Sequence, residues 1–364
     1  MIQDVMADAV NTDFILFDDP IKYYDAMLDD IRAAKKYVYI ETYKFGHQTI
    51  GMKFRDAITR KAKAGVEVKV LIDSWGGSSL PDNFFSELIK EGGEVRFFQK
   101  IKINVDFFTR SHRRNHRKFL LIDDEITYIG SSNLTEYNII WRESMLRIVG
   151  DIAFEFKKVF FQDFKIYNKY IRYRTDLVKT LHHKSCEIIR DVPSVTRQKI
   201  KKRYELLLRS AISEIVIETP YFLPGFKLRK ELIDAANRGV VVKVIIPQNS
   251  DVRMVNILHG RYLEMLHKHN IQFLYFQTHN LHAKILLIDN KIFSIGSPNF
   301  DYRSFRYMHE IALVSSRPEI TAMIRNHVEK TIGFCVPFDY TAWKRRPMIQ
   351  KFFEWLLLPL RHLL

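Results

Sequence analysis

The sequence predicts an α/β protein built from two similar halves, each a mixed β-sheet flanked by helices, packed together into one bilobal unit. The segment HRKFLLIDDEITYIGSSN, which begins at His116, recurs as HAKILLIDNKIFSIGSPN from His282. A strand, a helix and a second strand precede each copy in the same order. Of the 364 residues, 47% are hydrophobic, which is enough for a sizeable core. We therefore divide the chain into a first half (1–178), a second half (179–340) and a C-terminal tail (341–364).

The elements of the two halves are expected in the same order. YVYIETYKF, from Tyr37, and IVIETPYF, from Ile215, predict strands because they are rich in β-branched and aromatic residues. FRDAITRKAKAGVEVKVLID and LRKELIDAANRGVVVKVIIP each predict an amphipathic helix, a glycine that ends it and a buried strand. A further helix (NFFSELIKEGG or GRYLEMLHKHN) and a strand (EVRFF or IQFLYF) follow in each half. The repeated segments then predict a hairpin, with turns (DDE and DNK) that suit aspartate and asparagine.

The segment from 157 to 203 joins the halves and is dense in lysine, arginine and aromatic residues. We expect it to be partly helical, with a basic face exposed to solvent; direct contact of that face with anionic lipid is the alternative. The formal net charge of the chain, +15, indicates a polyanionic partner. Nucleic acid, an anionic membrane surface and a phosphate-bearing substrate all have this property.

Composition excludes several classes of protein. Only Cys186 and Cys335 are present, far apart in the sequence and in no Cys/His cluster, so neither a disulfide framework nor a zinc site is predicted. The N-terminus is acidic and lacks the basic flank and the apolar core of a signal peptide. No run of about 18 apolar residues occurs, so no transmembrane helix is predicted. We expect no cofactor, and we expect any contact with a membrane to be peripheral.

Both copies of the repeated segment carry the same polar residues at the same spacing. The pattern is His, any residue, Lys, four residues, Asp, six residues, Gly, Ser, any residue and Asn. It comprises His116, Lys118, Asp123, Ser131 and Asn133 in the first copy and His282, Lys284, Asp289, Ser297 and Asn299 in the second. A duplicated core would repeat the apolar stretches FLLI and ILLI and leave the polar positions free to vary. Repetition of the polar positions therefore indicates a shared chemical task.

These residue types suit a phosphate site. Along a strand, the histidine and the lysine of each copy lie on the same face and can reach one site. We expect the serine and asparagine of each copy to bind phosphate oxygens, and the lysines to stabilise their charge without a metal. One neutral imidazole attacks phosphorus while the second, protonated, donates to the leaving alkoxide. Asp123 and Asp289 belong to the same catalytic motif, but their position at the hairpin turns favours a role in fixing the turn.

These residues resemble the paired HKD motifs of the phospholipase D superfamily, and the resemblance covers nearly the whole chain. It implies that two phospholipase D-like halves pack about a pseudo-twofold axis, so that both motifs build one active site. It also implies a phosphohistidine intermediate, with His116 as the nucleophile and His282 as the acid. Glu143 and Glu310, which follow these histidines at nearly the same distance in the sequence, are implied as the carboxylates that orient the imidazoles.

Stretches of the chain are similar to bacterial cardiolipin synthases, which join two phospholipids by phosphatidyl transfer. TPYF and DYRSF in the second half carry this similarity, together with the Trp-Arg-Glu sequence that begins at Trp141. It implies a phosphatidyltransferase that acts on anionic phospholipids such as phosphatidylglycerol and needs no obligatory protein partner. Tyr221, Phe222 and Arg303 are then expected to contact the lipid. Met308 stands where that family usually has asparagine, which leaves the acceptor lipid open.

Two other functions are alternatives. A phospholipase D that hydrolyses headgroups differs from a synthase only in whether water or a lipid alcohol resolves the phosphoenzyme. A phosphodiesterase or nuclease of the same superfamily would also suit the basic charge of the chain. The small nucleases usually carry one motif and lack TPYF and DYRSF, so nucleic acid is the less favoured substrate.

The C-terminal tail, WKRRPMIQKFFEWLLLPLRHLL, is basic and aromatic but too short to span a bilayer. It predicts an interfacial membrane anchor, and the alternative is a terminal helix that covers an apolar groove of the core. The anchor residues are Lys344, Arg345, Arg346, Phe352 and Trp355. The loop NVDFFTRSHRRNH is a second candidate for contact with headgroups. The chain resembles the shorter cardiolipin synthases, without N-terminal membrane spans, so we expect a peripheral protein at the cytoplasmic side of the bacterial inner membrane.

Overall fold

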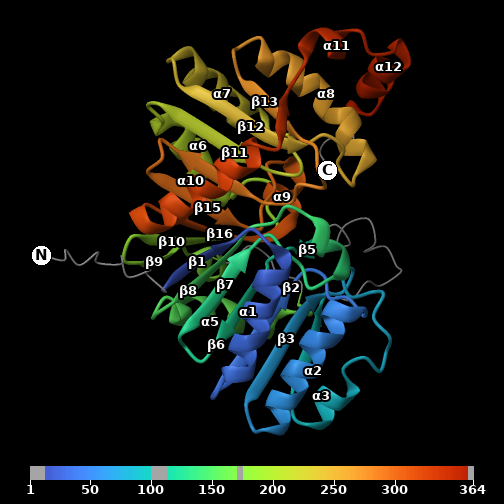
Figure 1. Cartoon of the computed structure of the whole chain (residues 1–364), viewed down its shortest axis with the longest axis vertical. Helices are drawn as coiled ribbons and strands as arrows, with labels where there is room; N and C mark the ends of the chain where they lie inside the picture. Colours follow the sequence, from blue (N-terminus) through green and yellow to red (C-terminus); the bar gives the residue numbers. More distant parts are fainter. Residues whose placement is uncertain (1–12, 100–112, 170–174, 360–364) are drawn as a thin grey trace, which may run out of the picture.

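The computed structural model describes residues 13–99, 113–169 and 175–359, which form two lobes that lie one above the other in Figure 1. The lower lobe is the first half. Its elements are, in order, β1 (Phe14–Phe17), α1 (Pro20–Ala33), β2 (Tyr37–Thr42), α2 (Thr49–Lys63), β3 (Glu67–Asp73), α3 (Ser86–Lys90), β4 (Glu94–Phe98), β5 (Arg114–Asn115), β6 (Phe119–Ile122), β7 (Ile126–Gly130), the 3₁₀ helix η1 (Glu136–Ile140), β8 (Met145–Val149) and α5 (Ala153–Ile166).

The remaining elements begin with a 3₁₀ helix at the end of the first half and continue through the second half and the tail, most of them in the upper lobe of Figure 1. In order, they are the 3₁₀ helix η2 (Thr175–Val178), β9 (Leu181–His183), β10 (Cys186–Asp191), α6 (Lys199–Ser210), β11 (Glu214–Glu218), α7 (Phe226–Asn237), β12 (Val241–Pro247), α8 (Arg253–His267), β13 (Gln272–Phe276), β14 (Ile285–Ile288), β15 (Ile292–Gly296), α9 (Tyr302–Tyr307), β16 (Met308–Ser315), α10 (Pro318–Ile332), β17 (Cys335–Pro337), α11 (Tyr340–Lys344) and α12 (Met348–Leu356).

Each lobe is built around one mixed sheet, and the two sheets share a strand order. The first sheet is ordered β1-β8-β7-β6-β2-β3-β4, and the second is ordered β17-β13-β12-β11-β14-β15-β16-β10-β9. From β10 back to β13, the second sheet repeats the order of the first. In both sheets the strands joined through helices are parallel, and the hairpin strands are antiparallel. The predicted duplication and the mixed α/β fold class are confirmed.

Backbone conformations at the helix ends and hairpin turns agree with the sequence prediction. The chain leaves α2 and α7 through Gly65 and Gly239, whose φ values are +83° and +90°. Glycine adopts this left-handed region without a steric penalty. In the first hairpin turn, Asp123 and Asp124 have φ values of +57° and +59°, and the corresponding pair in the second turn is also positive. Aspartate and asparagine tolerate this conformation better than most residues with a side chain.

Two expectations about individual elements were confirmed only in part. The segment NFFSELIKEGG is helical only over α3, because the residues before it form turns that bury Phe84 and Phe85 in the core. The segment from 157 to 203 is more than a surface linker. It includes the end of α5 and also β10, which pairs with β16 and takes the place in the second sheet that β1 has in the first.

Each lobe has its own buried cluster, and a further hydrophobic cluster spans the two lobes. Phe119 and Phe156 of the first half belong to the same buried cluster as Ile311 and Ile324 of the second half. Backbone pairing also crosses between the lobes, because β5 pairs in parallel with β16. Separation of the lobes would expose this apolar surface to water. The two halves therefore form one bilobal unit, as predicted.

The C-terminal tail forms α11 and α12, and α12 packs beside α8 at the outer end of the upper lobe (Figure 1). Most apolar side chains of α12 point to solvent: Phe352 is 52% exposed and Trp355 is 64% exposed. The residue that α12 buries is Glu354, whose carboxylate accepts two hydrogen bonds of 2.7 Å from Arg346. Trp343 and Leu357 of the tail pack partly against the core, so the alternative of a helix that covers an apolar groove holds only at these residues.

The structure does not describe every predicted membrane contact. Residues 104–112 of the loop NVDFFTRSHRRNH and the last five residues of the tail lie outside the described residues. Among the residues that the structure describes, no helix combines the length and the apolar character needed to cross a bilayer.

Candidate active site

The two repeated motifs meet where the lobes touch. His116 follows β5, and its backbone N–H donates to the carbonyl of His309 on β16 at 3.0 Å. His282 lies shortly before β14, and its N–H donates to the carbonyl of Arg142 at 2.8 Å. Each histidine is thus held by the backbone of the opposite half, one residue before the glutamate of that half.

This backbone pairing places each imidazole on the glutamate of the other half. Nδ1 of His116 lies 3.0 Å from Oε1 of Glu310, and Nδ1 of His282 lies 2.9 Å from Oε1 of Glu143. The sequence analysis related each glutamate to the histidine of its own half by their spacing. In the structure, each glutamate contacts the histidine of the other half instead. Because Nδ1 is engaged in both rings, Nε2 is the nitrogen left for chemistry. Each of these two histidine–glutamate pairs therefore takes one residue from each half.

Ser131 and Ser297 do not bind the substrate phosphate as predicted. Both serines are fully buried, and their hydroxyls donate to Glu143 and Glu310, respectively. A hydroxyl committed to a buried carboxylate is not available to a phosphate oxygen. The serines are therefore positioning residues, since they hold the carboxylates that orient the imidazoles.

Two further residues support the glutamates and were not identified from the sequence. The side-chain amide of Asn138 donates to Glu143, and Ser304 forms a side-chain hydrogen bond with Glu310. Alignment of the repeats beyond their GSxN stretches would have paired these positions. The information was present in the duplication, although the two residue types differ.

A cavity of about 250 Å³ opens beside both histidines. Most predicted substrate residues line it, namely Asn133, Tyr221, Asn299 and Arg303 together with His116 and His282. Oδ1 of Asn299 is buried and has no hydrogen-bond partner among the described residues, which is consistent with a group that binds substrate. Phe222, like Ser131 and Ser297, does not line the cavity. It is fully buried, with its ring 5.6 Å from that of Phe300, so its predicted lipid contact was wrong.

Aromatic and acidic side chains complete the cavity wall. The ring of Tyr43 lies 5.3 Å from that of His116, and the ring of Trp141 lies 5.1 Å from that of His282. Asp251 adds a carboxylate, to which the hydroxyl of Tyr221 donates at 2.9 Å. Sequence reasoning did not assign Tyr43 or Asp251 to the site. Tyr43 lies in a repeated strand segment, but its counterpart in the second half is Pro220.

The two motif lysines are buried beside the histidines. Nζ of Lys118 donates to the carbonyl of His116 at 2.6 Å, and Nζ of Lys284 donates to that of His282 at 2.7 Å. Burial, together with the charge of Lys284, lowers the pKa of Lys118 to about 7. Burial likewise lowers the pKa of Lys284 to about 8, although nearby carboxylates oppose the change. A phosphate anion in the cavity would favour the charged form of both lysines.

Asp123 and Asp289 lie at the hairpin turns, at the ends of β6 and β14 away from the histidines. The carboxylate of Asp123 accepts hydrogen bonds from the backbone N–H groups of Lys36 and Tyr37, at 2.7 and 2.9 Å. Asp289 accepts in the same way from the N–H of Ser213 at 2.7 Å. Each aspartate ties its turn to the start of the neighbouring strand, β2 or β11. Their place among the catalytic residues was wrong, and the alternative role in fixing the turn is the one observed.

The electrostatic surroundings of the two pairs differ. Burial raises the pKa of Glu310 to about 7 despite the nearby charge of Lys118. Burial also acts on Glu143, but the charge and hydrogen bond of His282 outweigh it and lower the pKa of Glu143. Burial and neighbouring lysines hold the pKa of His116 well below its usual value. Burial lowers the pKa of His282 as well, although the charge and the hydrogen bond of Glu143 oppose the change. The pKa of His116 is depressed further, and His282 is the imidazole that faces an ionised carboxylate.

Comparison with known proteins gives the family. The family model described as "Cardiolipin synthase, PLD-like domain" matches residues 27–165 and 205–332. The chain belongs to the cardiolipin synthase family. A cardiolipin synthase of Clostridium perfringens is 30% identical, over 94% of this chain and 75% of its own length. One from Oceanobacillus iheyensis is 31% identical, over 93% of this chain and 70% of its own length. As a member of the cardiolipin synthase family, the chain is a phosphatidyltransferase.

Solved structures agree on the fold of this cardiolipin synthase family member. The phosphatidylserine synthase of Haemophilus influenzae Rd KW20 superposes with a TM-score of 0.77, over 97% of this chain and 95% of its own, at 16% identity. The polyphosphate kinase of Porphyromonas gingivalis gives a TM-score of 0.63, over 96% of this chain and 53% of its own, at 12% identity. At such low identities the similarity establishes the bilobal phospholipase D-like fold alone.

Proposed function

We propose that the enzyme transfers a phosphatidyl group to a second phospholipid through a phosphohistidine on His116. The crossed histidine–glutamate pairs carry this proposal, because they present imidazoles from opposite halves to one cavity. Nε2 of His116 attacks the phosphorus of the donor phospholipid, and the bond between phosphorus and the headgroup oxygen breaks. Protonated His282 gives its proton to that oxygen, and the headgroup leaves as an alcohol.

The second step reverses the proton transfer. His282, now neutral, accepts the proton of a hydroxyl on the acceptor phospholipid while the hydroxyl oxygen attacks phosphorus. The bond between phosphorus and Nε2 of His116 breaks, and both histidines return to their starting protonation states. Water in place of the acceptor would give phosphatidic acid. The aromatic rings of Tyr43 and Trp141 beside the histidines restrict access of water, which favours transfer over hydrolysis.

Charge that develops on the phosphoryl oxygens is stabilised by groups around the cavity. Asn133 and Asn299 offer amide donors, and Arg303 adds a guanidinium group. The buried ammonium groups of Lys118 and Lys284 supply further positive charge at short range. These groups balance the phosphate charge through protein side chains, as expected for a phosphoryl transfer without a metal.

The proposal is tested by product analysis. Purified protein is incubated with phosphatidylglycerol alone, with phosphatidylglycerol and phosphatidylethanolamine, and in parallel with single-stranded DNA. Cardiolipin together with released glycerol is the expected result. Phosphatidic acid as the only lipid product would assign the protein to the hydrolases, and DNA cleavage without any lipid product would contradict both lipid functions.

Asp251 supports phosphatidylglycerol as the substrate. A carboxylate repels phosphate but accepts hydrogen bonds from hydroxyl groups, and Asp251 shares the cavity with the phosphate-binding asparagines. The glycerol headgroup carries two hydroxyls that can donate to Asp251 and Tyr221. The same position would hold the leaving glycerol in the first step and the glycerol moiety of the acceptor in the second.

Asp251→Ala is expected to lower the rate of glycerol release from phosphatidylglycerol about tenfold or more, since a hydrogen bond to a charged group contributes about 1.5–3 kcal/mol. Single-turnover kinetics measures this rate. Release of methanol from phosphatidylmethanol, whose headgroup has no hydroxyl, should change far less. Asp82→Ala, at an exposed position of the first half, is the matched control. Equal losses on the two donors would contradict a role in headgroup recognition.

We further propose that the protein binds the cytoplasmic surface of the membrane through the tail. The exposed apolar face of α12 and the basic residues before it, Lys344 and Arg345, support this proposal. A helix of this kind inserts its apolar side chains between lipids while its basic flank contacts anionic headgroups. Trp355 and Phe352 are the most exposed aromatic side chains of α12 available for insertion.

The double variant Phe352→Ser and Trp355→Ser is expected to bind phosphatidylglycerol vesicles more than tenfold more weakly. Burial of one large apolar side chain stabilises a complex by about 1.5–3 kcal/mol, and two side chains are removed. Vesicle co-sedimentation measures the affinity. Ile89→Ser is the matched control, because Ile89 is 57% exposed on α3 of the other lobe. Unchanged binding of the double variant would exclude α12 as the anchor.

A further inference from the structure

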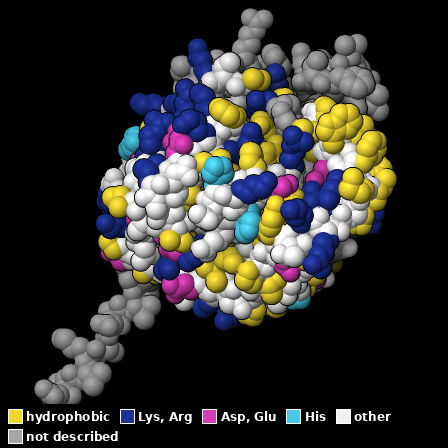
Figure 2. Space-filling model, turned by 90° about the horizontal axis from the view of Figure 1, so that it is seen from above, with side chains coloured by type: hydrophobic (Ala, Val, Ile, Leu, Met, Phe, Trp, Pro, Cys, Tyr) yellow, Lys and Arg dark blue, Asp and Glu magenta, His cyan; other side chains and the backbone are white. Residues whose placement is uncertain are grey.

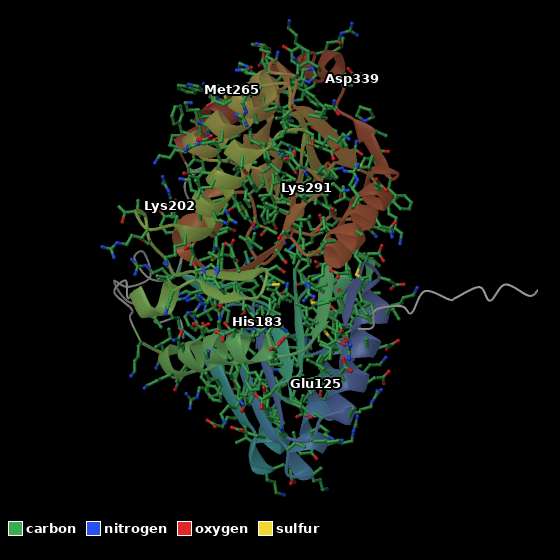
Figure 3. All side chains as sticks on the ribbon, turned by 90° about the vertical axis from the view of Figure 1, so that its left-hand side faces the viewer. Glu125, His183, Lys202, Met265, Lys291 and Asp339 are labelled. Atoms are coloured by element: carbon green, nitrogen blue, oxygen red, sulfur yellow. The ribbon has the colours of Figure 1, made fainter. Side chains whose placement is uncertain are left out.

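A second cavity, of about 700 Å³, lies between α7, α8 and α12. We call it the α8–α12 cavity. Figure 3 labels Met265, which lines it, and Asp339, at the start of α11, at the same end of the molecule. The catalytic cavity uses Val255 near the start of α8, whereas this one uses residues near its end. At about 1.5 Å per residue, Val255 and Met265 lie about 15 Å apart along the helix.

The α8–α12 cavity has an excess of positive charge. Five lysine and arginine side chains line it, against two glutamates. Arg346 is paired with Glu354, and Lys268 is paired with Glu264 at 3.0 Å. The other three basic residues, Arg229, Arg261 and Lys351, form no ion pair with a carboxylate of the described residues. Arg229 donates to the carbonyl of Pro224, and Lys351 donates to that of Lys344, so their charges are not balanced. Uncompensated cationic groups that converge on one cavity favour an anionic ligand.

The same cavity continues into an apolar groove. Trp355 and Leu358 line both the α8–α12 cavity and a neighbouring groove of about 400 Å³ formed with Leu356 and Pro359. Figure 2, which looks down on this end of the molecule, shows apolar side chains gathered at the right-hand edge beside lysine and arginine side chains. A ligand that fits both surfaces has an anionic head and an apolar tail. Among biological polyanions, a phospholipid has this form.

The position of α12 above this cavity is fixed by a close contact. Arg346 binds Glu354, and the guanidinium of Arg346 also lies 3.4 Å from the ring centre of Trp343. Glu354 in turn lies on Gly260 of α8, where an added Cβ would come within 2.8 Å of its Oε1. Only a glycine permits this approach without displacing the carboxylate. The contact of Glu354 with Arg346 and Gly260 therefore holds α12 beside α8. The α8–α12 cavity next to this contact stays open.

We infer that the α8–α12 cavity binds the headgroup of an anionic phospholipid, with the acyl chains directed along Trp355 and Leu358 into the bilayer. This second lipid site is separate from the catalytic cavity, and it rests on the proposed attachment of α12 to the membrane. It would make that attachment selective for anionic lipid, and it would retain the enzyme on the membrane regions that contain its substrate.

The test compares binding of the full-length protein to phosphatidylcholine vesicles with and without phosphatidylglycerol. The double variant Arg261→Glu and Lys351→Glu is expected to lose at least tenfold in affinity for the anionic vesicles and to bind neutral vesicles like the wild type. Arg60→Glu with Lys63→Glu, which makes the same charge change at exposed positions on α2 of the other lobe, is the matched control and should keep full affinity.

Three results would overturn the inference. The first is wild-type affinity of the Arg261→Glu and Lys351→Glu variant for anionic vesicles. The second is an equal loss of affinity in the α2 control, which would indicate that binding depends on the overall charge of the protein. The third is displacement of the protein from anionic vesicles by millimolar inorganic phosphate, which would indicate a site for free phosphate. Failure of the anchor itself is distinguishable, because it appears as unchanged binding of the Phe352→Ser and Trp355→Ser variant. Turnover of monomeric short-chain phosphatidylglycerol tests the proposed reaction independently, since that assay needs no membrane surface.

Discussion

His116→Ala is expected to abolish phosphatidyl transfer, with a fall in kcat of about 10⁴-fold or more, because the variant lacks the atom that forms the bond to phosphorus. Glycerol release from phosphatidylglycerol measures the rate. A donor with radiolabelled phosphate measures the covalent intermediate: label should accumulate on the wild-type protein during turnover and be absent from the variant. His282→Ala should still become labelled by a donor with a good leaving group, since its role is to protonate that group.

The same labelling experiment can contradict the proposed roles of His116 as the nucleophile and His282 as the acid. Label that persisted on His282 in the His116→Ala protein would reverse the roles of the histidines. His183→Ala provides the matched control, because His183 lies on β9, away from the cavity, as labelled in Figure 3. Loss of activity in this control would mean that histidine replacement acts on the fold and not on the chemistry.

The electrostatic difference between the two pairs fits the different roles that we propose for the duplicated motifs. Burial comes first among the causes that depress the pKa of His116, followed by the charges of Lys118 and Lys284 and, more weakly, Arg303. In the repeat alignment, the position of Arg303 is occupied by Tyr137 in the first half. Both residues line the cavity. The duplication has therefore kept the reacting groups and changed a neighbour, whose charge adds to the stronger depression of the pKa of His116.

The sequence predicted those features that the duplication displays twice. The hairpins, the glycines after α2 and α7, and the histidines and asparagines of the cavity all recur at matching positions, and the structure contains each of them. Local chemistry also distinguished the turn aspartates, because Asp123 and Asp289 occupy positions that favour positive φ. Features that depend only on residues close together in the sequence could thus be predicted without a structure.

Features that depend on contacts between the two halves could not be predicted from the sequence. Spacing alone cannot tell which half provides the glutamate for a histidine. That choice follows from the pairing of β5 with β16 and of Arg142 with Leu281. The role of Ser131 depends on the same geometry, since a serine beside an asparagine suits a phosphate until a buried glutamate is found within its reach. Phe222 was misplaced for a related reason: its neighbour Tyr221 faces the cavity, while Phe222 packs into the core.

The second large expected effect concerns the two glutamates, each of which contacts the histidine of the other half. Glu143→Gln and Glu310→Gln are both expected to lower kcat on phosphatidylglycerol by about 10²–10⁴-fold, because a glutamine does not stabilise an imidazolium as a carboxylate does. The two variants should differ with a phosphatidyl ester of p-nitrophenol. This leaving group departs without protonation, so the first step no longer needs His282. Glu143→Gln should then recover most of the rate of p-nitrophenol release, whereas Glu310→Gln should not, because His116 must still be oriented for attack.

The rates of the two glutamine variants on the two donors test whether each glutamate supports the histidine of the other half. If each glutamate served the histidine of its own half, Glu310→Gln would be the variant rescued by p-nitrophenol and Glu143→Gln would remain slow. Equal losses on both donors would contradict separate roles altogether. Glu125→Gln, at the exposed hairpin turn labelled in Figure 3, should behave as the wild type on both. Since each reactive pair contains one residue from each half, rescue of the Glu143→Gln variant alone would establish that the first half supplies both the nucleophile and the carboxylate that supports the acid.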